Sequence, residues 1–142
     1  MKHVLVTLAI ICISTSTFAQ ADNILGTWIT ADKKGNVEIY KNTNGAYYGK
    51  IVWMTAPNDP VTGKPQLDSK NPDVSKRSQT ILGSLTFINF TYDDGEYTGG
   101  KIYDCRDGKM YTGKLWLNVD GTLSMRGYIG FLYSTETWTR LK

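Results

Sequence analysis

Acidic and amide side chains gather in two parts of the sequence where they could bind a cation or move a proton. The first part, residues 55–79, contains Asp59, Asp68, Asn71 and Asp73, whose oxygens are the ligands that calcium prefers. Their spacing matches neither an EF-hand nor a repeat-type calcium loop, and turns and helix caps need the same residue types. We therefore predict no metal site and interpret these side chains as local hydrogen-bond acceptors.

The second part runs from Asp104 to Asp107, two carboxylates that flank Cys105. They could form a catalytic pair, but carboxylates in a turn more often accept hydrogen bonds from nearby backbone N–H groups. Cys105 has neither a Cys-x-x-Cys partner nor a helix N-terminus to activate its thiol. The only histidine is His3, so the rest of the sequence lacks the base of Ser-His-Asp and Cys-His catalysis. We predict a protein that is not an enzyme and uses no cofactor.

Two arginines, Arg77 and Arg126, could together bind an anion. Strand alternation places Arg126 on the outer face, opposite Met125, unless a bulge or a mouth position turns it inward. The alternative is that Arg77 pairs with Asp68 or Asp73 and fastens its own loop. The sequence leaves both interpretations open.

The N-terminus has the pattern of a secretory signal. Lys2 precedes the apolar stretch 4–13, and small residues lead to a cleavage box that ends at Ala19. Cys12 follows Ile11 rather than a small residue, which argues against a lipid anchor. We predict a signal peptide over residues 1–20, a single domain over residues 21–142, and a periplasmic or secreted protein.

The composition of the chain narrows its partners. The formal net charge is +3, with both signs interspersed, which is typical of a solvated surface rather than a nucleic-acid site. No second apolar stretch is long enough to span a membrane. We predict a small-molecule partner and no nucleic acid, and the sequence leaves the oligomeric state open.

Turn signals and alternation predict the elements that carry these residues. Asn-Gly or Asp-Gly pairs at 44–45, 94–95, 107–108 and 120–121 are strong hairpin signals. Between them, residues 109–119 and 122–131 alternate apolar and polar side chains with period two. We predict strands over 24–31, 36–42, 46–54, 84–92, 96–104, 109–119, 122–131 and 134–141. The fold that they favour is an all-β, antiparallel up-and-down barrel of about eight strands, with a two-sheet sandwich as the alternative.

A long connection after the third strand interrupts this rhythm. Residues 55–80 are rich in Pro, Asx and Ser, and a loop of this length in a compact domain is usually functional or disordered. Asn71 could cap one helical turn with Pro72 in its first position. We predict a lid or gate across one barrel mouth, ordered by Asp68, Asn71, Asp73 and Arg77.

Several sequence motifs, in order, resemble the bacterial secreted family called domain of unknown function 2147. They are GTW at 26–28, YYGKIVW at 47–53, D..NPD...R at 68–77, GGKIYD..DGKMY at 99–111, MRGYIG at 125–130 and TETWTR at 135–140. The chain departs from the family pattern at Cys105 and at Ser78-Gln79, which replaces a second arginine. The resemblance implies a lipocalin-like barrel with no assigned activity.

The resemblance also implies how the barrel closes. In lipocalin-like barrels, a basic residue of the last strand lies over the tryptophan of a first-strand Gly-x-Trp. The residues expected in this closure are Gly26, Trp28, Trp138 and Arg140.

Two functions follow from the predicted barrel. The first is binding of a hydrophobic or amphipathic ligand by inward side chains, for which we predict Trp53, Tyr103, Tyr111, Leu115, Leu117, Met125 and Ile129. The same side chains could instead fill the barrel. The protein would then be an interaction or structural module of the cell envelope, with Trp116 and Tyr128 as its outer patch.

Overall fold

A computed structural model describes residues 19–142, so most of the predicted signal peptide lies outside the described residues. Within that range the chain forms one antiparallel sheet of nine strands. The strands are β1 (Gly26–Ile29), β2 (Gly35–Lys41), β3 (Tyr47–Met54), β4 (Leu85–Asp93), β5 (Glu96–Thr98), β6 (Lys101–Asp104), β7 (Lys109–Leu117), β8 (Leu123–Ile129) and β9 (Leu132–Arg140). Two short 3₁₀ helices, η1 (Asp22–Ile24) and η2 (Val74–Lys76), lie outside the sheet.

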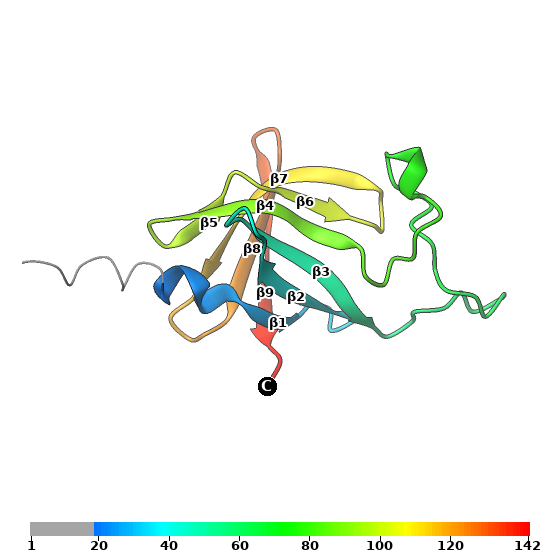
Figure 1. Ribbon diagram of the computed structural model, residues 1–142, viewed down its shortest axis with the longest axis horizontal. Helices are drawn as coiled ribbons and strands as arrows, with labels where there is room; N and C mark the ends of the chain where they lie inside the picture. Colours follow the sequence, from blue (N-terminus) through cyan, green and yellow to red (C-terminus); the bar gives the residue numbers. More distant parts are fainter. Residues whose placement is uncertain (1–18) are drawn as a thin grey trace, which may run out of the picture.

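The sheet closes on itself (Figure 1). Its order is β3-β2-β1-β9-β8-β7-β5-β4-β6, and the additional pairings β3–β4 and β7–β6 join its ends. The predicted all-β barrel is therefore confirmed and the sandwich alternative is wrong. Closure removes the free sheet edges that would otherwise template aggregation.

The Asx-Gly turns reverse the chain where the sequence predicts. Gly45, Gly95 and Gly121 all have positive φ, between 83° and 89°. Asp94 also has a positive φ, of 45°, so both central residues of its turn occupy the left-handed region that a tight hairpin needs. These turns lie at the end of the barrel that also holds β1's start and β9's end.

One predicted strand, residues 96–104, is broken into β5 and β6. Gly99 has a φ of 76°, and a Cβ on Gly100 would lie 2.4 Å from the ring of Phe90. The backbone must turn and approach an aromatic ring at this point, which only glycine allows. β5 and β6 both still pair with β4 and β7.

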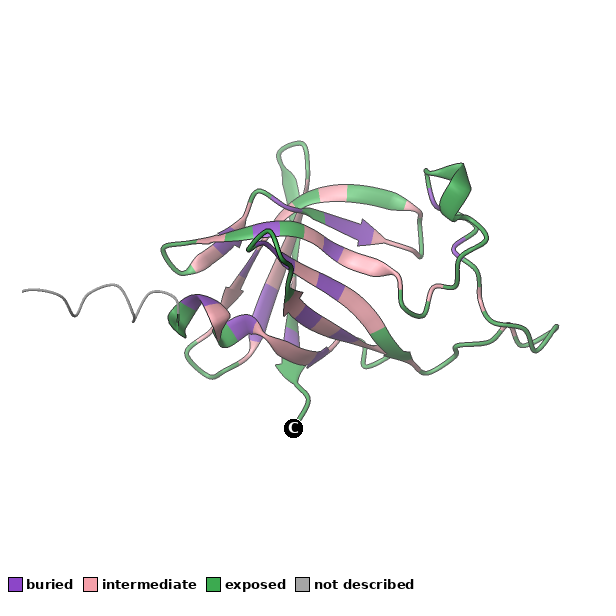
Figure 2. Ribbon diagram, viewed as in Figure 1, coloured by how far each residue is buried: buried purple, intermediate pink, exposed green. Residues whose placement is uncertain are grey.

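The hydrophobic core fills the end where the last residues of β9 meet the segment that enters β1. Its most deeply buried side chains are Trp28, Tyr97, Phe87, Phe90, Ile24, Leu115 and Leu123. Figure 2 shows buried residues along the strands and mainly exposed ones on the turns and the long connection. The opposite end of the barrel is less completely filled, and the candidate site lies there.

Candidate functional site

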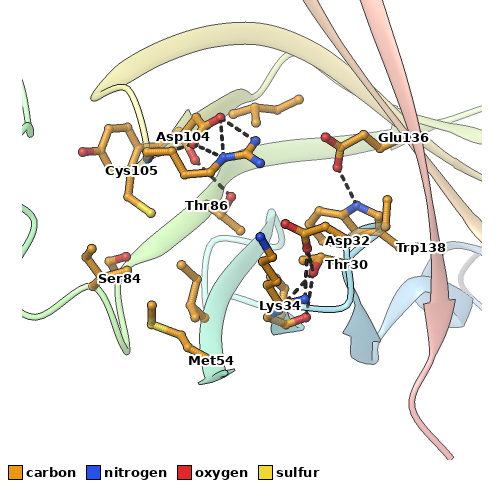
Figure 3. A pocket seen from close by; sticks show the side chains of 18 of the residues that line it. Thr30, Asp32, Lys34, Met54, Ser84, Thr86, Asp104, Cys105, Glu136 and Trp138 are labelled. Atoms are coloured by element: carbon orange, nitrogen blue, oxygen red, sulfur yellow. Dashed lines mark hydrogen bonds and ion pairs between the residues drawn. The ribbon is translucent and has the colours of Figure 1, made fainter. Parts of the chain in front are cut away.

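A cavity of about 400 Å³ occupies the less filled end of the barrel. Its walls come from the β1–β2 turn, the facing ends of β3 and β4, the β6–β7 turn, and the middle of β8 and β9 (Figure 3). The cavity forms because β1 stops at Ile29 while β9 continues. β1 and β9 pair only at Trp28 with Arg140 and at Ile29 with Thr139, so β9 has no β1 partner beside the mouth.

The floor of the cavity is apolar. Ile51, Ile102 and Met125 contribute aliphatic surface, and Trp138 contributes an indole face. Trp138 is 4% exposed and stacks on Phe87 with ring centroids 5.2 Å apart. It belongs both to the packed core and to the cavity lining, so it forms the boundary between the filled and open parts of the barrel. Trp138 was predicted for barrel closure, and the structure places it at the cavity floor.

The rim of the cavity is charged. The Arg106 guanidinium donates to both carboxylate oxygens of Asp104, with distances between 2.7 and 3.1 Å. Burial by itself would raise the pKa of Asp104, but the hydrogen bonds from Arg106 outweigh it and lower that pKa. The same bonds raise the pKa of Arg106, and the nearby charges of Glu136 and Asp32 add to the effect. Arg106 is therefore a fixed cation among three carboxylates.

Two of these carboxylates reach the rim from opposite walls. Glu136 faces inward from β9 and accepts a hydrogen bond from Trp138 Nε1 at 3.1 Å. Asp32, in the β1–β2 turn, accepts from the Thr30 hydroxyl and from the Lys34 backbone N–H. The Lys34 contact is the main cause of the lowered pKa of Asp32. The rim can thus accept hydrogen bonds from the polar part of a ligand, and the floor can contact the apolar part of the same ligand.

A second cavity, of about 340 Å³, adjoins the first. Both are lined by Ile102, Asp104, Arg106, Met125 and Glu136. The second cavity extends between β7 and the β8–β9 hairpin, where Tyr111, Ile129, Leu132 and Tyr133 line it. Since five residues are common to both, the two spaces adjoin and together form one elongated recess.

Four of the predicted ligand-binding residues line this recess, namely Tyr103, Tyr111, Met125 and Ile129. Leu115 and Leu117 face inward but pack in or against the core at the filled end, so they line neither cavity. Trp53 is 47% exposed and points away, because β3 carries a bulge. Val37 pairs with Ile51 but Asn36 pairs with Trp53, so Val52 is an extra residue and the alternation changes phase. Met54 lines the cavity in place of Trp53.

The predicted gate residues fix the long connection to the barrel rather than lining the recess. Asp68 is 3% exposed and accepts from the Tyr103 hydroxyl at 2.6 Å and from Asn71 Nδ2 at 2.7 Å. Burial and this bond to Asp68 raise the pKa of Tyr103. Thr55, Ala56 and Gln66 are the residues of this segment that line the first cavity. Gating by residues 55–80 stays a prediction.

The helical turn of this connection differs from the predicted one. Asp73, not Asn71, caps η2, where its carboxylate accepts from the Ser75 backbone N–H. Arg77 donates to the Asn71 backbone carbonyl at 2.7 Å, and the ion pair of this loop joins Lys76 to Asp73. The expected pairing of Arg77 with Asp68 or Asp73 is therefore wrong.

The other candidates from the sequence are engaged elsewhere. Arg126 lies on the outer face between Trp116 and Tyr133, whereas Arg77 donates to the Asn71 backbone carbonyl. The two arginines have different partners and do not form the anion site considered above. Asp107 accepts from the Tyr111 hydroxyl. Burial raises the pKa of the half-buried Cys105, and the nearby Asp104 adds to that shift, so its thiol stays protonated at neutral pH. Within residues 19–142, no group of three or more His, Cys, Asp or Glu side chains is arranged to hold a metal ion.

Sequence reasoning missed Asp32, Met54, Arg106 and Glu136. Glu136 stands two residues before Trp138 on the terminal strand, so alternation could have placed both on the inner face. Met54 was hidden by the bulge in β3. Asp32 and Arg106 lie in turns, where the sequence has no periodicity to indicate direction.

The filled end contains the contacts expected for closure. Arg140 lies over the Trp28 indole, with its guanidinium carbon 4.2 Å from the ring centroid. Its nitrogens donate to the backbone carbonyls of Leu25 at 2.7 Å and Asn23 at 2.5 Å. Gly26 has a φ of 125°, and a Cβ there would lie 2.8 Å from Arg140 Nη1. One arginine thus joins the last strand to the segment that enters the first.

A closed antiparallel barrel with a recess at one end and an Arg-over-Trp contact at the other defines a lipocalin-like protein. The chain belongs to the family described as "Uncharacterized protein conserved in bacteria (DUF2147)", whose model matches residues 26–140. It is similar in structure to protein HP1028 of Helicobacter pylori, which is described as belonging to the lipocalin family. The TM-score is 0.69 and the sequence identity is 25%, over 84% of this chain and 83% of that chain. Comparison with curated proteins finds no match. Residues 19–142 include no helix with the length and apolar character needed to cross a membrane.

Proposed function

We propose that this protein binds a small hydrophobic or amphipathic molecule in the recess at the open end of its barrel. The observation that carries the proposal is a pair of confluent cavities of about 400 and 340 Å³. Each lies within the size range of small-molecule sites, roughly 300–1,000 Å³. A packed core closes the other end, so a ligand enters and leaves through the mouth.

The lining of the recess supports an amphipathic ligand. Ile102, Met125 and Trp138 can bury an apolar chain or ring, which is the main favourable contribution to binding in such pockets. Arg106 and Glu136 can orient a polar group at the rim. The description of the Helicobacter pylori protein as a lipocalin agrees with this assignment.

We further propose that the protein acts by binding rather than catalysis and that it is exported. The carboxylates of Asp104 and Asp107 are engaged by Arg106 and Tyr111, which leaves neither poised as a general base. The signal-like residues 1–20 support a periplasmic or secreted location.

Native mass spectrometry of protein isolated from its own cellular compartment tests the proposal directly. We expect a retained small molecule that is released on denaturation. Repeated preparations that carry no ligand, together with failure to bind an amphipathic dye such as anilinonaphthalene sulfonate, would contradict it.

A matched pair of variants tests whether the dye binds in the recess. Met125→Trp fills the floor that both cavities share, and we expect dye affinity to fall about tenfold or more. Val119→Trp adds the same side chain at a fully exposed position in the turn at the filled end, and should leave affinity unchanged. Circular dichroism and thermal unfolding verify that both variants fold. Equal affinities for the two folded variants would place the dye outside the recess.

A second candidate function, an envelope interaction module, is favoured by one outer surface. Lys114 and Arg126 both lie over the Trp116 ring, at 5.3 and 5.2 Å from its centroid. Aromatic and arginine side chains together are common at protein interfaces. Under this alternative, Trp116→Ala reduces capture of a protein partner and leaves dye binding intact.

A further inference from the structure

The tip of the β8–β9 hairpin exposes large apolar side chains to solvent. Ile129 and Leu132 are each 63% exposed, Tyr133 is 62% exposed and Phe131 is 93% exposed. Residues 127–135 contain no charged side chain. The tip projects beyond the rest of the barrel, as the loop at the top of Figure 1, and is exposed in Figure 2.

The fold does not require these side chains at the tip. Gly130, with a φ of 59°, is sufficient for the reversal, and four other hairpin turns use Asn-Gly or Asp-Gly pairs. Residues at turn tips are usually polar, and a contiguous exposed apolar patch on a soluble protein marks an interaction site. The Ile-Gly-Phe-Leu-Tyr sequence therefore indicates a surface that is covered by something.

The side chains around the tip are arranged in layers. Ile129, Phe131 and Leu132 form the outermost layer. Behind them, the rings of Tyr128 and Tyr133 lie 6.1 Å apart, and the Arg126 guanidinium lies 4.3 Å from the Tyr133 ring centroid. From the tip toward the barrel, the side chains are first aliphatic or phenyl, then phenolic, and then cationic. This order matches the change from hydrocarbon to headgroup across a bilayer surface, where tyrosines occupy the boundary.

The tip is also continuous with the recess. Ile129, Leu132 and Tyr133 belong to the tip and line the second cavity. Whatever covers the tip is therefore next to that cavity.

We propose that the β8–β9 tip inserts into a lipid surface and holds the barrel mouth at the boundary between lipid and water. A second copy of the chain is a poorer occupant. A stable interface buries roughly 800 Å² on each partner, contributed by about 20–30 residues, whereas the tip is one convex turn. A lipid surface needs no complementary shape. Vesicle binding is expected from the empty protein, so this inference does not depend on the identity or existence of a ligand in the recess.

Sedimentation with lipid vesicles tests the proposal. The vesicles contain phosphatidylethanolamine and phosphatidylglycerol in equal parts, and intact mass establishes that all variants share the same N-terminus. We expect the wild-type protein to sediment with the vesicles. The variant Phe131→Ser/Leu132→Ser should bind them at least about tenfold more weakly. The control Val119→Ser removes a fully exposed apolar side chain at the other end of the barrel and should bind like the wild type.

The depth of insertion supplies a second readout that does not rely on loss of binding. The fluorescence that Phe131→Trp adds to the wild-type signal should shift to shorter wavelength when vesicles are added. The fluorescence that Val119→Trp adds should not shift. High salt should weaken binding only modestly, because apolar contact rather than charge dominates the insertion. Three results would overturn the proposal: no sedimentation of the wild type, equal sedimentation of the tip and control variants, or a tip-dependent dimer in solution without vesicle binding.

Discussion

Each end of the barrel carries an arginine and a tryptophan, but the two arginines have different partners. At the filled end, Arg140 covers Trp28 and donates to two backbone carbonyls. At the open end, Arg106 donates to Asp104 near the cavity that Trp138 floors. Arg140 thus connects segments that are distant in sequence, whereas Arg106 pairs with a residue two positions away.

The partner of each arginine therefore determines its role. Removal of Arg140 leaves carbonyls of the entering segment without a donor and uncovers an indole. Removal of Arg106 frees one carboxylate that water can reach. The filled end should therefore govern stability and the open end should govern ligand binding, and three experiments test that division.

The largest effect is expected for Trp28→Ala, because Trp28 is completely buried. We expect the free energy of unfolding to fall by about 3–5 kcal/mol, as for other large-to-small changes in a core. Trp53→Ala removes the same side chain from an exposed position and should cost less than about 1 kcal/mol. Denaturant unfolding measures both, and similar losses would mean that the filled end does not dominate stability.

A smaller effect separates the two arginines. Arg140→Ala should lower the free energy of unfolding by about 1–3 kcal/mol, since charged hydrogen bonds and a cation–π contact are lost. Arg106→Ala should change it by about 0–1 kcal/mol, because its side chain is 69% exposed, yet it should alter dye affinity. The division fails if Arg106→Ala destabilises the fold more than Arg140→Ala does.

The smallest effect is a pH dependence at the mouth. Because the folded-state pKa of Asp104 is lowered, its contribution to stability is present above its unfolded pKa, near about 4, and is lost as the pH falls through the folded value. Asp104→Asn should therefore lose less stability than the wild type on acidification. The difference should be below about 1 kcal/mol because the partner Arg106 is largely exposed. Identical pH profiles would show that this pair contributes nothing measurable.

Much of the fold follows from local sequence signals. The Asx-Gly turns require residues that tolerate positive φ, and Asp94-Gly95 has it at both positions. Alternation in residues 109–119 and 122–131 assigns the inner and outer faces of β7 and β8, including the outward Arg126. These signals are local, because φ preference and period-two alternation depend only on neighbouring residues.

Only the tertiary structure decided which inward residues form a site. Tyr111 and Leu115 share the inner face of β7 at different heights, yet Leu115 is in the core and Tyr111 lines the recess. Alternation determines the face of a strand but not the height along the barrel, which depends on where the long-range pairing of β1 and β9 stops. The bulge that moves Trp53 outward is likewise a property of the register between β2 and β3, and no single strand contains that information.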